Sequence, residues 1–95
     1  MALGQRDTLS EIQGRAAIRQ VDAAVKKLLE IANGVAADHA GRLSVGIINT
    51  QFKDAGGSYP EYSAAVKAAI DRGYITMHAS GGYLSFTQAG ADLFA

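Results

Sequence analysis

The sequence predicts a single α+β domain that is mostly helical and ends in a β-hairpin. Apolar residues recur at helical spacing in three segments, and the spacing changes from about 3.6 to 2 after Gly73. Capping residues or glycines bound each segment. The chain has 95 residues, of which 48% are apolar and 19% charged, a composition typical of one globular domain with a modest core.

The first segment is predicted to be a long helix over about residues 8–33. Thr8 and Glu11 form a T-x-x-E helix start. A helix of that length would span roughly 37 Å, which is about the width of a small domain or more. We therefore expect residues 1–20 to be a lead and helix extension that forms a homodimer contact, and residues 21–95 to be the folded domain. The alternative is a monomer whose long helix wraps the core. One side of this helix is apolar, through Val21, Val25, Leu28, Ala32 and Val35.

The opposite side of the long helix is charged. Asp22 and Lys26 stand four residues apart, acid before base, and are predicted to pair along the helix.

After the helix, Leu43 is predicted to form a short strand. Ser44 is predicted to cap a helix from Val45 to Ala55, whose inward-facing residues are Val45, Ile48 and Phe52.

A second capped helix is predicted over residues 58–73. Ser58 and Glu61 form a reciprocal capping box, and Pro60 lies in the first turn. Gly73 is predicted to end the helix in the left-handed conformation. The side of this helix that faces the core is predicted to be Tyr62, Ala65, Val66, Ala69 and Ile70.

Two strands joined by a Gly81-Gly82 turn are predicted next, because apolar and polar residues alternate on both sides of these glycines. Both glycines are expected to need positive backbone angles, and His78 is expected to be replaceable. A short helix is predicted to start at Thr87, with Leu93 and Phe94 folding back onto the core. The predicted register places Met77 opposite Phe86, Ala79 opposite Leu84, and His78 opposite Ser85.

From about Val21 to Ala95, the order of elements resembles the winged helix-turn-helix superfamily. The segment YITMHASGGYLSFTQAGADLFA is similar to the wing and tail of many bacterial regulators, with Thr87 and Gly90 in the threonine-x-x-glycine helix start. The segments GRLSVGIINTQF and SYPEYS have a weaker similarity to the LOTUS group of winged helices, which is associated with RNA metabolism and protein contacts. Here Tyr62 precedes Ser63 where that group has a tyrosine-glycine pair.

This resemblance implies a regulator of transcription whose 58–73 helix and hairpin bind nucleic acid, DNA in preference to RNA. Ser63 would contact phosphate or a base edge, and Ala64 would allow close approach to a thymine methyl. Lys67 and Arg72 would neutralise phosphates. The candidate nucleic-acid-binding residues are Ser58, Tyr59, Ser63, Ala64, Lys67, Arg72, Ser80 and Gly81.

The charge balance supports an alternative function. Nine basic residues are matched by nine acidic ones, whereas a DNA-binding domain usually has a positive excess. The alternative is therefore a winged-helix adaptor that binds other proteins without nucleic acid. Basic groups gathered on one face would favour nucleic acid, and a neutral face with an exposed apolar patch would favour the adaptor.

No catalytic or cofactor-binding pattern is evident. Asp38, His39 and Ser44 lie close in sequence and suggest a hydrolase, but a solvated connector explains them better. The chain has no cysteine, and His39 and His78 lack metal-ligand spacing. We therefore expect a protein that is not an enzyme and uses no cofactor or metal. Without a signal pattern or a membrane-spanning apolar run, a cytoplasmic location is expected.

Overall fold

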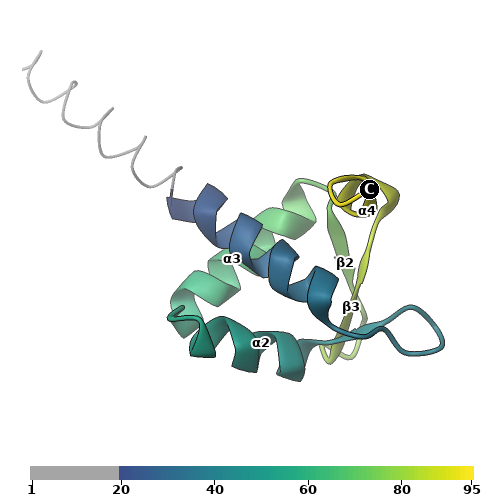
Figure 1. The fold of residues 1–95 in the computed structure, drawn as a ribbon, viewed down its shortest axis with the longest axis horizontal. Helices are drawn as coiled ribbons and strands as arrows, with labels where there is room; N and C mark the ends of the chain where they lie inside the picture. The colour runs from purple at the N-terminus through teal and green to yellow at the C-terminus, as the bar shows by residue number, and fades with distance from the viewer. Residues whose placement is uncertain (1–19) are drawn as a thin grey trace, which may run out of the picture.

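A computed structural model describes residues 20–95 of the chain. The expected lead over residues 1–19, including the helix start at Thr8, lies outside the described residues. The described part is α+β and mostly helical, with one small antiparallel sheet (Figure 1). Its elements are the N-terminal helix (described over residues 20–34), β1 (Leu43–Ser44), α2 (Val45–Asp54), α3 (Tyr59–Asp71), β2 (Ile75–Met77), β3 (Tyr83–Phe86) and α4 (Gln88–Asp92).

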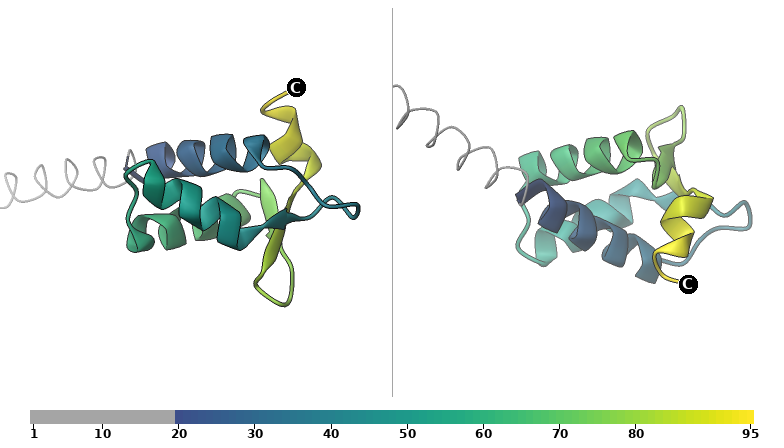
Figure 2. Two further views of the ribbon diagram at one scale, coloured as in Figure 1. Left: turned by 60° about the horizontal axis from the view of Figure 1, so that its bottom comes forward. Right: turned by 90° about the horizontal axis from the view of Figure 1, so that it is seen from above.

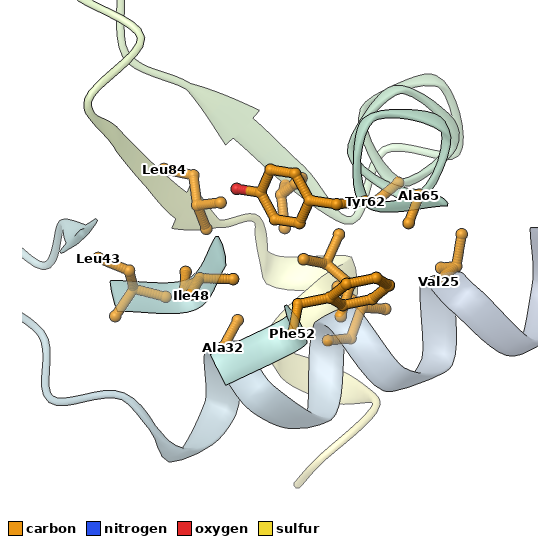
Figure 3. Close-up of a cluster of buried hydrophobic side chains, with 12 residues drawn as sticks. Val25, Ala32, Leu43, Ile48, Phe52, Tyr62, Ala65 and Leu84 are labelled. Carbon is orange, nitrogen blue, oxygen red and sulfur yellow. The ribbon is translucent and has the colours of Figure 1, made fainter. Parts of the chain in front are cut away.

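Three helices enclose the core, and the sheet closes it at one end (Figure 2). Phe52 of α2 and Tyr62 of α3 meet edge to face at 5.6 Å between ring centroids. The predicted inward positions Ile48 and Phe52 are fully buried, whereas Val45 is half-buried against the core. The buried residues, shown as sticks in Figure 3, are Val25, Leu28, Leu29, Ala32, Leu43, Ile48, Phe52, Tyr62, Ala65, Ala69, Ile75 and Leu84.

The predicted helix boundaries are confirmed at α2 and α3. The Ser44 hydroxyl accepts a hydrogen bond from the Ile47 amide and caps α2. At α3, the Ser58 hydroxyl accepts from the Glu61 amide while the Glu61 carboxylate accepts from the Ser58 amide, so the capping box is complete. Gly73 follows α3 with a φ of 78°, the left-handed conformation that ends many helices.

The hairpin has a different register from the predicted one. The strand order is β1-β3-β2, and the observed pairs in the hairpin are Ile75 with Phe86, Thr76 with Ser85, and Met77 with Leu84. The three predicted pairs, Met77 with Phe86, Ala79 with Leu84 and His78 with Ser85, are therefore wrong. Because the shift is an even number of residues, each side chain keeps its predicted face of the sheet.

The register differs because the turn is longer than two residues. The His78 amide donates to the Tyr83 carbonyl, and residues 79–82 form the loop. His78 Nδ1 accepts from the Ser80 amide at 3.1 Å, and the Ser80 hydroxyl accepts from the Gly82 amide at 3.2 Å. These side-chain bonds stabilise the longer loop. Consequently Gly81 is the only one of the two loop glycines with a positive φ, of 75°, so the expectation for Gly82 is wrong.

The helix start at Thr87 is confirmed, and the chain then returns against the hairpin. The Thr87 hydroxyl accepts from the Gly90 amide at 3.1 Å and caps α4. The Phe94 ring packs edge to face on Phe86 at 5.9 Å, although it remains partly exposed. Leu93 is 52% exposed, so the expectation that it folds onto the core is wrong.

Candidate functional site

A shallow apolar groove lies between α3, the start of α2 and strand β2, and we call it the α3 groove. Its volume is about 300 Å³. Apolar side chains from all three elements form its walls, and polar residues of α3 lie among them. The lining residues are Val45, Tyr59, Tyr62, Ser63, Val66, Lys67, Ile70, Asp71 and Met77.

The α3 groove includes two residues that the helical spacing assigns to the core. Tyr62, Ala65 and Ala69 are buried as predicted, but Val66 is only half-buried and Ile70 is 38% exposed. The neighbouring strand β2 has only three residues, too few to cover this flank of α3. The buried face of α3 is therefore narrower than its apolar face. The part that the core does not bury, at Val66 and Ile70, is apolar surface available to a partner.

The side chain of Tyr62 extends from α3 toward the sheet (Figure 3). It is 6% exposed, and its hydroxyl has no hydrogen-bond partner among the described residues. Burial raises the pKa of this phenol, with a smaller contribution from the nearby Tyr59. The groove therefore contains a buried polar group that the rest of the described chain does not satisfy.

The candidate nucleic-acid-binding residues divide into several sets in the structure. Ser63, Ala64 and Lys67 are exposed together on α3, as predicted. The Ser58 hydroxyl caps α3 by accepting from the Glu61 amide, and Tyr59 at the start of the helix is 63% exposed.

The remaining candidates lie beyond α3. Ser80 and Gly81 are exposed in the hairpin loop. Arg72 follows α3, and its guanidinium donates to the Asp22 carboxylate of the N-terminal helix at 2.6 Å. That ion pair replaces the predicted Asp22–Lys26 pair and directs Arg72 toward the N-terminal helix.

Other basic residues are also engaged in contacts within the fold. Lys27 Nζ donates to the Ala55 carbonyl at 2.8 Å, next to the end of α2. The Arg42 guanidinium bonds Asp38 at 3.0 Å and lies over the Tyr83 ring at 4.8 Å. Residues 20–95 hold six basic side chains, which are Lys26, Lys27, Arg42, Lys53, Lys67 and Arg72.

The same range holds seven acidic side chains, so the described part has no positive excess. On the exposed side of α3, Lys67 stands between Glu61 near the start of the helix and Asp71 at its end. The exposed side of α3 is therefore nearly neutral rather than basic.

The connector before β1 explains the apparent hydrolase pattern. The Asp38 carboxylate accepts hydrogen bonds from the backbone amides of Ala40 and Arg42 and from the Arg42 guanidinium. The bond from the Arg42 amide is the largest cause of the lowered pKa of Asp38. The Ser44 hydroxyl caps α2. The side chains of Asp38 and Ser44 therefore both make local hydrogen bonds that stabilise the backbone around them.

Two more hollows lie along the N-terminal helix, whose extension over residues 1–20 is expected to form the homodimer contact. The larger, about 710 Å³, lies between the start of the described N-terminal helix, Phe52 of α2 and the first turns of α3. The other, about 330 Å³, lies between Leu29 and the Phe94 end of the chain. Within residues 20–95 no group of three acidic or histidine side chains could hold a metal ion. No helix in the same range is long and apolar enough to cross a membrane.

Sequence reasoning identified the exposed polar residues of α3 but missed the α3 groove beside them. Val66 and Ile70 carry the available signal, because they widen the apolar face of α3 beyond the residues that the core buries.

No family model, curated protein or solved structure matches this chain.

Proposed function

We propose that this chain is a winged-helix domain that binds protein partners through the α3 groove. The element order supports the winged-helix assignment, since a helix, a short strand, two helices joined by a tight turn and a hairpin follow one another. The pairing of β1 with β3, next to β2, is consistent with a hairpin wing. On this assignment α3 takes the place of the recognition helix, which contacts DNA in helix-turn-helix proteins, and we propose that here it contacts a protein instead.

The observation that carries the proposal is an apolar groove on a nearly neutral face of α3. The centres of protein–protein interfaces are apolar and poor in charge, whereas a surface for nucleic acid must neutralise phosphates. Val66, Ile70 and Met77 offer apolar contact in the groove, and Lys67 is accompanied by Asp71 one helical turn away. These features fit an adaptor better than a nucleic-acid reader.

Nucleic-acid binding is the second candidate, and the exposed residues of α3 favour it. Ser63, Ala64 and Lys67 share one exposed side, and Lys67 has no ion-pair partner among residues 20–95. A homodimer through the N-terminal helix would present this side twice, as many DNA-binding regulators do. Under this candidate Lys67 neutralises a phosphate, and duplex DNA remains the preferred ligand.

Selection from a displayed library of random ten-residue peptides tests the proposal. Peptides enriched on the wild-type chain should lose at least about tenfold in affinity for Ile70→Glu, because a charge then lies in the apolar groove. Gln51→Glu, an equal charge change at an exposed site on α2, is the matched control and should bind normally. The proposal fails if no peptide is enriched, or if both variants bind equally well.

A salt titration with duplex and single-stranded probes tests the second candidate in parallel. If α3 reads nucleic acid, Lys67→Ala should make the slope of log affinity against log salt shallower by about 0.9 on duplex DNA. Absence of salt-dependent binding by the wild-type chain at about 50 mM salt would exclude it, because a phosphate-dominated contact is strong at low salt.

A further inference from the structure

Strand β2 lies at the edge of the sheet, and its outward backbone groups can be identified. The Thr87 amide donates to the Tyr74 carbonyl, and the His78 amide donates to the Tyr83 carbonyl. Since residues of an antiparallel pair alternate in direction, Tyr74, Thr76 and His78 bond β3. Ile75 and Met77 therefore direct their amides and carbonyls away from β3, toward the open edge.

This open edge adjoins the α3 groove. Met77 belongs to both, because it is the last residue of β2 and also lines the groove. Its partner across the hairpin is the buried Leu84, so the Met77 side chain lies on the core side of the sheet, toward α3. A strand added beside β2 would therefore point alternate side chains into the groove.

We propose that the α3 groove takes an extended peptide segment of a partner protein, which adds to the sheet as a strand next to β2. This inference rests on the proposed function and specifies how the partner binds. The main chain of the segment exchanges hydrogen bonds with Ile75 and Met77, and one apolar side chain enters between Val66 and Ile70.

The charged side chains in the groove bear on the composition of the segment. Lys67 and Asp71 have opposite signs, and neither has an ion-pair partner among the described residues. Four residues of helix place them about 6 Å apart along the axis of α3. Successive side chains of a strand point to opposite faces, so the residues on either side of the apolar one point away from the groove. Because the charges of Lys67 and Asp71 cancel, the segment needs no net charge and is apolar where it faces the groove.

Amide hydrogen exchange on the full chain tests the binding mode. In the free protein, the Ile75 and Met77 amides should exchange faster than the Thr76 and His78 amides, which are bonded to β3. Addition of a synthetic peptide with the sequence enriched in the library should slow exchange at Ile75 and Met77 at least about tenfold. N-methylation of the peptide should weaken binding at alternate residues only, because every second amide of a strand faces β2.

The outcomes separate this inference from the proposed function. A peptide that requires Ile70 but binds as a helix, or leaves Ile75 and Met77 unprotected, refutes strand addition while the adaptor function stands. Protection of these two amides without peptide, together with a doubled mass in solution, shows that a second copy occupies the edge and also refutes the inference. If no peptide binds, the proposed function and the inference fail together.

Discussion

Replacement of Gly90 by alanine is the sharpest test of how α4 packs on the sheet. A Cβ atom at this position would lie 2.0 Å from the Tyr74 carbonyl oxygen and 2.9 Å from Cδ1 of Phe86. The carbonyl cannot turn aside freely, because it accepts a hydrogen bond from the Thr87 amide at 3.0 Å. Gly90→Ala should therefore push α4 away from β2 and β3.

The expected cost follows from two opposing effects. Overpacking in a well-packed site costs about 1–3 kcal/mol, whereas alanine gains about 1 kcal/mol over glycine in a helix. Because the added Cβ would lie only 2.0 Å from a backbone oxygen, the overpacking cost should fall in the upper part of that range, and the net loss should be about 1–2 kcal/mol. For a domain of this size, each kcal/mol lowers the melting temperature by about 4–8 °C. Gly90→Ala should consequently melt roughly 5–15 °C below the wild-type chain.

Thermal unfolding followed by circular dichroism measures this effect, and Gly34→Ala is the matched control. Gly34 is also helical, and a Cβ there would meet nothing within 4 Å. Its alanine variant should therefore melt at the wild-type temperature or above it. If Gly90→Ala melts as high as Gly34→Ala, the close approach between α4 and Tyr74 is absent and the reasoning is refuted.

Three further predictions concern single side chains. Gly81→Ala should lower stability by about 1 kcal/mol because its φ is 75°, whereas Gly82→Ala should not; equal melting temperatures would contradict the described loop. Tyr62→Phe should melt no lower than wild type, because the lost hydroxyl has no partner; a drop of more than about 5 °C would reveal a hidden bond. The pKa of Asp38 is lowered in the folded chain, so the ionised carboxylate stabilises the fold above the ordinary carboxyl pKa of about 4. This stabilisation is lost as the pH falls through the lowered pKa of the folded chain. Asp38→Asn should thus melt below wild type at pH 7, with a gap that narrows under acid; a gap that persists at low pH would show that charge is not the cause.

The helix starts could be predicted from the sequence because each depends on residues within one turn. Ser44, Ser58 and Thr87 all cap helices through a hydroxyl that accepts from an amide three residues later. Such a bond needs only the local chain, and therefore the spacing of serine, threonine and glutamate is sufficient evidence. The short strand at Leu43 was predictable for a related reason, because the following cap leaves it little room to extend.

The hairpin register could be predicted only in part. Alternation of apolar and polar residues determines which face each side chain takes, but it cannot separate registers that differ by two residues. That choice depends on the loop, where His78 and Ser80 bond nearby amides and favour four residues over two. A Gly-Gly pair indicates that a turn is present without giving its length.

The charge of the candidate site could not be predicted, because it depends on a contact across 50 residues of sequence. Local spacing pairs Asp22 with Lys26 and leaves Arg72 free for a phosphate. In the structure Asp22 bonds Arg72, which follows α3. An exposed ion pair of this kind contributes at most about 1 kcal/mol to stability. Its consequence for the predicted site is larger, because it holds one of the two predicted phosphate-binding cations against the N-terminal helix. In the same fold Val66 is only half-buried and Ile70 is exposed, and these two observations together are why we propose an apolar protein partner for α3 rather than phosphate.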